Sequence, residues 1–312
     1  MATAPVISIV IPTWNNLEML KLCLRSVAEH SDLEHEVVLH VNDGSDGTSD
    51  WVRKIGVRHT RTAENVGICH AMNLAAQACR GEYLVYLNDD MYVLPGWDRP
   101  LYEHAAETAD REPTFASGTM VQSSSMAPSV VLADYGSDPS AFDEQRLLSD
   151  FRDGRIASAD WNGATWPPCC IHRKWWNLVG GYSIEFSPGF YSDIDFSMKL
   201  WQIGCRNFVG TGSSLVYHFG ETSTSQIRGR KKRNVRDARR LFLGKWGILP
   251  TTFKRYYLRC GQPYRGRVAE ANWRNNAWER IRLFAQKAIP HRRSIGRSAV
   301  LDDAQAIAAA TE

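Results

Sequence analysis

Three polar clusters, each directly after an apolar run, hold the side chains of this sequence that could do chemistry. They begin at Pro12, Asp43 and Asn88. The last of them, Asn88-Asp89-Asp90, places two carboxylates side by side. Magnesium typically binds one or two protein carboxylates and completes its shell with water and phosphate oxygens. The cluster is therefore a candidate metal site for a phosphate-containing ligand, although Asn and Asp are also common in solvated turns.

Asp43 has the chemistry of a nucleotide-binding residue. A carboxylate can accept a hydrogen bond from a base N–H or a ribose hydroxyl, and the following Gly44 lets the backbone approach a ligand closely. An Asp-Gly pair is equally typical of a turn, and the Ser or Thr after it can cap the next helix. Taken alone, this motif favours the turn, and the functional interpretation gains weight only because polar residues also follow the strands that end before Pro12 and Asn88.

The elements around these clusters indicate a layered α/β sheet, because short β-branched runs alternate with helical patterns in the first half. Strands are expected over 6–11, 36–41 and 83–87, and helices after Asn16, from about 49 to 56, and over 67–79. Ligands of open α/β sheets lie beyond the carboxyl ends of strands. The three clusters are therefore expected to line one cleft.

The second half is less regular. The segment 122–160 is rich in Ser, Asp and Ala with weak periodicity, and we expect mostly loop there. Helices are expected over about 173–179 and from about Ser192 to Gly204, separated by a Gly180-Gly181 turn. Beyond Arg228 the chain becomes basic and then helical.

Composition narrows the class of protein. The 312 residues are 44% hydrophobic with a formal net charge of +3, which suits one large folded unit and implies no overall attraction to nucleic acid. The seven cysteines form no CxxC pair, which argues against a zinc site or a disulfide framework. No apolar run approaches the length of a membrane span. We expect a cytoplasmic protein, or one peripheral at the inner face of a membrane.

Four motifs in register resemble the inverting GT-A-fold glycosyltransferases of family 2. They lie at 8–15, 42–48, 64–73 and 81–90, and a second set runs from Trp161 to Ser223. The resemblance implies a GT-A fold, a mixed α/β sheet flanked by helices. It implies a catalytic domain over 1–225, with a nucleotide-sugar and metal half over about 1–120 and an acceptor half over about 160–225. Residues 226–312 would form a basic, largely helical extension.

The resemblance also implies which residues form the site. The donor pocket would include Pro12, Thr13, Asn15, Asp43, Asn65, Gly67, Asn88 and Asp89; a divalent metal, Mn or Mg, would be bound by Asp90 and His218; and the catalytic base would be Asp193. Two positions depart from the family pattern, since Asn88 replaces the first acid of the Asp-x-Asp motif and Ser192 replaces a Glu.

Asp193 and His218 each have an alternative interpretation. Ser192 with Asp195 three residues later has the spacing of a capping box, in which acids complement the helix dipole. A lone histidine is more often structural, but His218 stands in a segment that resembles the family's late histidine motif. His40 and His172 have no such context. The aromatic segments around Trp161, Trp166 and Tyr182 resemble the acceptor side of the family, although each could simply pack in the core.

The run from Arg228 to Arg240 contains eight Lys or Arg and no aromatic residue. It is typical of a solvated, mobile segment. It could also close over a diphosphate or contact anionic lipid headgroups. Nucleic-acid binding is not expected, since no aromatic residues interleave with the charges.

The expected function is an inverting glycosyltransferase that moves a sugar from a nucleotide-diphosphate donor to a saccharide, glycolipid or glycan hydroxyl. By resemblance, this fits bacterial surface polysaccharide or glycolipid synthesis. A non-catalytic nucleotide-sugar-binding protein is the alternative that Asn88 and Ser192 favour, and a nucleic-acid-binding protein acting through 228–240 is a third. A Rossmann dehydrogenase is disfavoured, because no GxGxxG follows the first strand.

Overall fold

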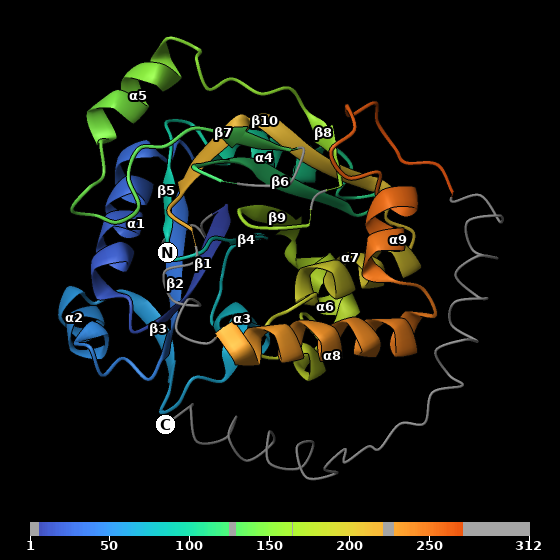
Figure 1. Cartoon of the computed structure of the whole chain (residues 1–312), viewed down its shortest axis with the longest axis horizontal. Coiled ribbons are helices and arrows are strands. Elements are labelled where there is room, and N and C mark those ends of the chain that lie inside the picture. The colour runs from blue at the N-terminus through green and yellow to red at the C-terminus, as the bar shows by residue number, and fades with distance from the viewer. Residues whose placement is uncertain (1–5, 125–128, 164, 221–227, 271–312) are drawn as a thin grey trace.

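A computed structural model describes residues 6–124, 129–163, 165–220 and 228–270, with the backbone alone over 228–233. Within these residues a single ten-stranded mixed sheet runs through the molecule, and helices cover both of its faces (Figure 1).

The first half supplies β1 (Ile7–Trp14), α1 (Leu17–His30), β2 (His35–Asn42), α2 (Thr48–Ile55), β3 (Arg58–Thr62), α3 (Gly67–Gln77), β4 (Tyr83–Tyr86), β5 (Met91–Val93) and α4 (Asp98–Glu107). The second half supplies β6 (Thr114–Gln122), β7 (Val130–Leu132), α5 (Glu144–Arg152), β8 (Trp161–Asn162), β9 (Cys169–His172), α6 (Arg173–Val179), the short η1 (Ile184–Phe186), α7 (Ser192–Gln202) and β10 (Asn207–His218). The C-terminal part contains α8 (Arg228–Trp246), α9 (Pro250–Thr252) and η3 (Phe253–Tyr257).

The direction of the strands explains where the site lies. The sheet order is β3-β2-β1-β4-β9-β6-β10-β5, and β3, β2, β1 and β4 are mutually parallel. The strand β9 is antiparallel to both β4 and β6, and β10 is parallel to β6. The strands β1, β2, β4, β6 and β10 therefore all end at one edge of the sheet.

Alternating apolar side chains on these strands fill a core on each face of the sheet. Ile9 and Ile11 of β1 pack with α1, α2 and α4, whereas Val10 packs with α3, α6, α7 and α8 on the opposite face. The β-branched runs of the sequence are thus buried on both sides, as in other layered α/β proteins.

The sequence-based elements are largely confirmed. The helices α6 and α7 lie where the spacing predicts them, and Gly56 ends α2 with a left-handed backbone (φ 69°). The described part of 122–160 is mostly loop, as expected, but it also contains two elements that the sequence did not reveal. These are β7 and α5, the latter capped by Asp143, whose side chain accepts a hydrogen bond from Arg146 N. Long-range contacts, such as the bidentate Arg25–Glu144 pair, hold α5 in place.

The C-terminal part is packed onto the domain. Phe242 of α8, Phe253 and Leu258 lie in the same buried cluster as Ile194 and Phe196 of α7. The basic run 228–240 belongs to a continuous helix, rather than the mobile segment that its composition favours. The domain boundary at 225 remains a prediction, and Ser223 lies outside the described residues.

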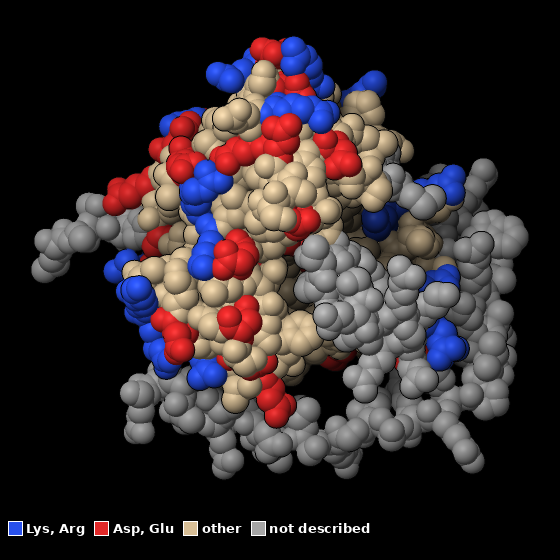
Figure 2. Space-filling model, turned by 60° about the vertical axis from the view of Figure 1, so that its left-hand side comes forward, with Lys and Arg blue, Asp and Glu red and all other residues tan. Residues whose placement is uncertain are grey.

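The distribution of charged side chains on the surface agrees with the nearly balanced net charge. Acidic and basic side chains are mixed over the described part of the face in Figure 2. None of the helices in the described residues is long and apolar enough to span a membrane.

Candidate active site

The first cluster of the site joins the ends of β1 and β2. Asn15 Nδ2 donates to Asp43 Oδ2 at 2.8 Å, and Asn15 Oδ1 accepts from the N–H of Gly44 at 3.0 Å. Both Asn15 and Asp43 adopt positive φ angles, 47° and 61°, which non-glycine residues rarely do. The contacts hold this strained backbone so that the Asp43 carboxylate is presented at the sheet edge.

Gly44 is required by space as well as by its φ of 78°. A Cβ there would lie 2.1 Å from Ser49 Oγ and 2.7 Å from a methyl group of Val41. Pro12 and Thr13, at the end of β1, are buried beside this turn. The sequence-predicted residues Pro12, Thr13, Asn15 and Asp43 are therefore brought together.

Asn65 and Gly67 have local structural roles in this structure. Asn65 Oδ1 accepts a hydrogen bond from the N–H of Gly67 at 2.9 Å, which forms the turn that leads into α3. A Cβ on Gly67 would lie 2.7 Å from Pro188 Cα, and the next residue, Ile68, donates its N–H to the Pro188 carbonyl. This contact joins the start of α3 to the loop before Asp193.

The second cluster contains the acids after β4. Asp90 is buried, and its Oδ2 lies 3.4 Å from Nε2 of His218 at the end of β10. The pairing of Met91 with His218 in the antiparallel β5–β10 ladder fixes this approach. Asn88 and Asp89 are partly exposed beside Asp90. The structure therefore unites Asp90 with His218, which are 128 residues apart in the sequence.

Gln122 orients His218 and was missed from the sequence. Its Oε1 lies 2.8 Å from His218 Nδ1, and its Nε2 donates to the Ser124 carbonyl at 2.6 Å. An amide oxygen only accepts, so this contact assigns a proton to Nδ1 and turns Nε2 towards Asp90. Gln122 ends β6, the neighbour of β10, and only this register could have revealed its role.

Three atoms near these acids are buried without a hydrogen-bond partner among the described residues. They are Thr13 Oγ1, Asn16 Nδ2 and Asp90 Oδ1. Burial, together with the charge of Asp90, raises the pKa of Asp89 to about 7. Unsatisfied polar atoms and adjacent buried acids are costly unless a ligand or cation compensates them.

These features fit a divalent cation. Among the described residues no group of three or more His, Cys, Asp or Glu side chains could hold a metal, so the protein offers few ligands. Magnesium binds to proteins in this way and keeps water or substrate phosphate as its other ligands. Two neighbouring ligands of an octahedral ion stand about 3 Å apart, close to the 3.4 Å between Asp90 Oδ2 and His218 Nε2.

Asp193 begins the third cluster, at the start of α7. The Tyr182 hydroxyl donates to Asp193 Oδ1 at 3.1 Å. Burial raises the pKa of Asp193 to about 7, and the hydrogen bond from Tyr182 and the charge of Lys254 act in the opposite direction. A carboxylate with this pKa suits proton abstraction near neutral pH.

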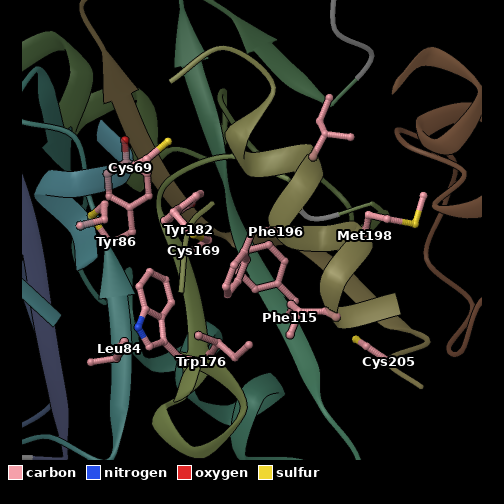
Figure 3. Close-up of a cluster of buried hydrophobic side chains, with 14 of the residues drawn as sticks. Cys69, Leu84, Tyr86, Phe115, Cys169, Trp176, Tyr182, Phe196, Met198 and Cys205 are labelled. Atoms are coloured by element: carbon pink, nitrogen blue, oxygen red, sulfur yellow. The ribbon is translucent and has the colours of Figure 1, made fainter. Parts of the chain in front are cut away.

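Tyr182 is itself held rigidly. Its ring packs on Phe196 at 5.1 Å and near Tyr86, in the buried layer shown in Figure 3. Its backbone N–H and carbonyl both bind the side chain of Asn73 on α3, each at 2.8 Å. Asn73 thus fixes the turn that contains Tyr182 to α3.

The capping-box interpretation of Ser192 and Asp195 is wrong. The residue before α7 is Tyr191, with a φ of 62°, and Ser192 Oγ donates to the Gly189 carbonyl instead of capping the helix. Asp195 points into the protein, where it accepts from Ser183 Oγ at 2.5 Å and Trp246 Nε1 at 2.7 Å. Lys245 Nζ lies 3.0 Å from Asp195 Oδ1. Asp195 therefore connects α7 to α8.

The histidines without motif support have structural contacts. His40 is buried between the hydroxyls of Thr60 and Thr62, and burial lowers its pKa to about 4. His172 caps α6 by accepting from Lys174 N.

Comparison with known proteins shows what the first third of the chain and its fold resemble. The family model described as "Glycosyl transferase family 2" matches residues 8–112. The chain is 26% identical over 313 residues to the uncharacterized protein MT1568 of Mycobacterium tuberculosis (strain CDC 1551 / Oshkosh), covering 93% of this chain and 88% of the relative. It is 20% identical over 163 residues to the putative glycosyltransferase EpsH of Bacillus subtilis (strain 168), covering 51% of this chain and only 46% of EpsH.

Two solved structures share the fold. The crystal structure of S. aureus TarS 1-349 has a TM-score of 0.54 and 12% identity, covering 97% of this chain and 78% of that chain. The mannosyltransferase PcManGT from Pyrobaculum calidifontis, in complex with GDP-Man and Mn2+, has a TM-score of 0.53 and 17% identity, covering 98% and 81%. The motifs within residues 8–112 agree with the family model, and the chain shares the GT-A fold of these two structures.

Proposed function

We propose that the protein transfers a sugar from a nucleotide-diphosphate donor to an acceptor hydroxyl, with inversion at the anomeric carbon. The observation that carries this proposal is the convergence of Asn15 and Asp43, Asp90 and His218, and Asp193 around one edge of the sheet. The mannosyltransferase with the same fold is in complex with GDP-Man and Mn2+, which supports a nucleotide sugar and a divalent metal here.

On the donor side, Asp43 accepts hydrogen bonds from the nucleoside, and Pro12, Thr13, Asn15 and Gly44 shape its pocket. Asn88 and Asp89 lie beside the diphosphate, with Asn65 and Gly67 forming the neighbouring turn. Asp90 and His218 would hold Mn or Mg, and a divalent cation there would supply positive charge to stabilise the departing diphosphate.

On the acceptor side, Asp193 removes the proton from the attacking hydroxyl. The hydroxyl oxygen then bonds to the anomeric carbon as the bond from that carbon to the diphosphate breaks. Tyr182 positions the Asp193 carboxylate through its hydrogen bond. Because the base and the leaving group lie on opposite sides of the sugar in such a displacement, the product has inverted configuration.

A non-catalytic nucleotide-sugar-binding protein remains a second candidate, because Asn88 removes one acid from the metal motif. In the proposed enzyme, residues 1–225 would be the catalytic domain. We further propose a saccharide, glycolipid or glycan acceptor in surface polysaccharide synthesis, and a cytoplasmic protein that contacts a membrane through 228–240.

A panel of nucleotide-diphosphate sugars tests the proposal, with thermal stability and donor hydrolysis measured with and without Mn²⁺. A true donor at a hundred times its Kd should stabilise the fold by about 2.7 kcal/mol. Asp43→Ala should lose this stabilisation, whereas Asp50→Ala, which removes an exposed acid on α2, should keep it. Stabilisation without hydrolysis or transfer would favour the binding protein, and the absence of both would refute the proposal.

A further inference from the structure

The chain after α9 forms part of the acceptor half. Asn162 N donates to the Gln262 carbonyl at 2.8 Å, and Gly261 N donates to the Asn162 carbonyl at 2.9 Å. Cys260 packs so closely that a Cβ on Gly163 would lie 2.5 Å from its sulfur. These contacts fix the segment from η3 to Gln262 against β8 and the loop that follows it.

That loop carries Trp166 to the edge of the sheet that contains the site. In the antiparallel β4–β9 pair, Cys169 at the start of β9 lies opposite Tyr86 at the end of β4. Trp166 precedes β9 by three residues, so it lies at the end of the sheet where β4 delivers Asn88 and the acids after it. One face of its ring stacks on Trp161 at 4.9 Å, and its Nε1 is buried without a partner among the described residues.

Lys254 of η3 lies beside this ring. Its Nζ is 5.7 Å from the centroid of Trp166, which is a cation–π distance. Its side chain is partly buried and makes no hydrogen bond or ion pair with the described residues, whereas its backbone carbonyl accepts from Cys260 N. The neighbouring lysines differ, since Lys245 pairs with Asp195 and Lys199 donates to two backbone carbonyls. The three N–H donors of Lys254 are therefore available to a ligand.

The surrounding charges indicate what that ligand is. The charge of Lys254 acts on Asp193 and lowers its pKa, so the ammonium lies within electrostatic range of the base. An acceptor that carries its own negative charge would be repelled by Asp193 and by the acids after β4. A cation near the base would offset this repulsion for an anionic acceptor. A neutral acceptor would not be repelled and would need no such cation.

We propose that Lys254 and Trp166 form a subsite for an anionic group, and that the acceptor is a saccharide bearing a carboxylate or a phosphate close to the hydroxyl that is glycosylated. This inference rests on the proposed function and specifies its acceptor class. The ring of Trp166 contacts the sugar, and Lys254 binds the anion.

Ligand-observed NMR titration with three matched probes tests it: methyl glucoside, methyl glucuronide and methyl glucoside 6-phosphate, each with a nucleoside diphosphate and Mn²⁺ present. The wild type should bind at least one anionic probe about tenfold more tightly than the neutral one, as expected for one charge-assisted contact of about 1.4 kcal/mol. The stronger anionic probe identifies carboxylate or phosphate as the recognised group.

Lys254→Met should abolish the preference and Lys254→Arg should keep it. Lys174→Met is the matched control, since Lys174 also lies over a tryptophan, Trp175 at 4.9 Å, but at the opposite end of β9. Equal binding of charged and neutral probes by the wild type, or a preference that survives in Lys254→Met, would overturn the inference. A Lys254→Met variant that changed the pH profile of transfer but kept the preference for the anionic probe would also overturn it. Nucleoside diphosphate binding, measured in parallel, tests the proposed function separately.

Discussion

The donor edge and the acceptor side of this site are assembled in different ways. At the proposed donor edge, Asn15, Asp43 and Asp90 follow the adjacent strands β1, β2 and β4, and Asn15 joins two of these strand ends through Asp43 and Gly44. On the proposed acceptor side, Asp193 depends on Tyr182, which Asn73 fixes, and the same helix is tied to α8 through Asp195 and Trp246. In the proposed enzyme, donor binding would therefore depend mainly on the ends of adjacent strands, whereas transfer would also depend on the C-terminal part of the chain.

The comparison is tested most strongly by Asp193→Asn. General-base catalysis contributes about 10²- to 10⁴-fold, and we expect a loss of kcat in that range. The amide keeps the size of the side chain, so the fold should be retained. Single-turnover kinetics with a donor from the panel measures the effect. A kcat within a factor of a few of the wild type would remove Asp193 from the mechanism.

The dependence of the acceptor side on α8 is tested by Lys245→Met. Asp195 is fully buried, and removing its cation should destabilise the protein by about 3 kcal/mol, since a buried charge loses its partner. Urea unfolding measures the change. Lys21→Met, which breaks an exposed pair with Glu18, should cost less than about 1 kcal/mol. Equal effects of the two variants would show that α8 is not needed to hold α7.

Gln122→Leu tests whether the donor edge also depends on distant residues, because it removes the hydrogen bond between Gln122 and His218. Loss of a residue that orients a metal-binding histidine typically lowers metal affinity about 10- to 100-fold. Calorimetry with Mn²⁺ and a nucleoside diphosphate measures this. The control is Gln202→Leu on α7, whose amide donates to the sulfur of Met198 in the same helix. An unchanged affinity in Gln122→Leu would show that His218 needs no such support.

The smallest expected effect is a shift in the pH dependence of kcat in Tyr182→Phe. Asp193 acts as a base only when deprotonated, and its pKa is raised to about 7, so kcat should fall as the pH drops below about 7. Tyr182→Phe removes a donor that stabilises the carboxylate, so the pKa should rise and the fall should begin at higher pH. One hydrogen bond of about 1 kcal/mol corresponds to roughly a fivefold loss near pH 6.5. A shift to lower pH would contradict the assigned contact.

The same contrast explains what could be predicted from the sequence. Asp43 and Asp90 became candidates because they follow the ends of apolar runs, and His218 and Asp193 became candidates by family resemblance. Gln122, Lys245 and Lys254 carry no such signal.

Their roles depend on strand register and on helix packing between residues far apart in the sequence. Gln122 meets His218 because β6 pairs with β10, and Lys245 meets Asp195 because α8 packs against α7. The helix α5 was missed for a related reason. Its weak pattern is stabilised by the Arg25–Glu144 pair.

The most direct test of the central claim compares Asp90→Asn with Asp193→Asn in one calorimetric titration with Mn²⁺ and a nucleoside diphosphate, followed by a transfer assay on the same samples. The account predicts that Asp90→Asn loses the Mn²⁺-dependent part of binding, whereas Asp193→Asn binds like the wild type but does not transfer. Normal Mn²⁺-dependent binding by Asp90→Asn, or normal transfer by Asp193→Asn, would contradict it.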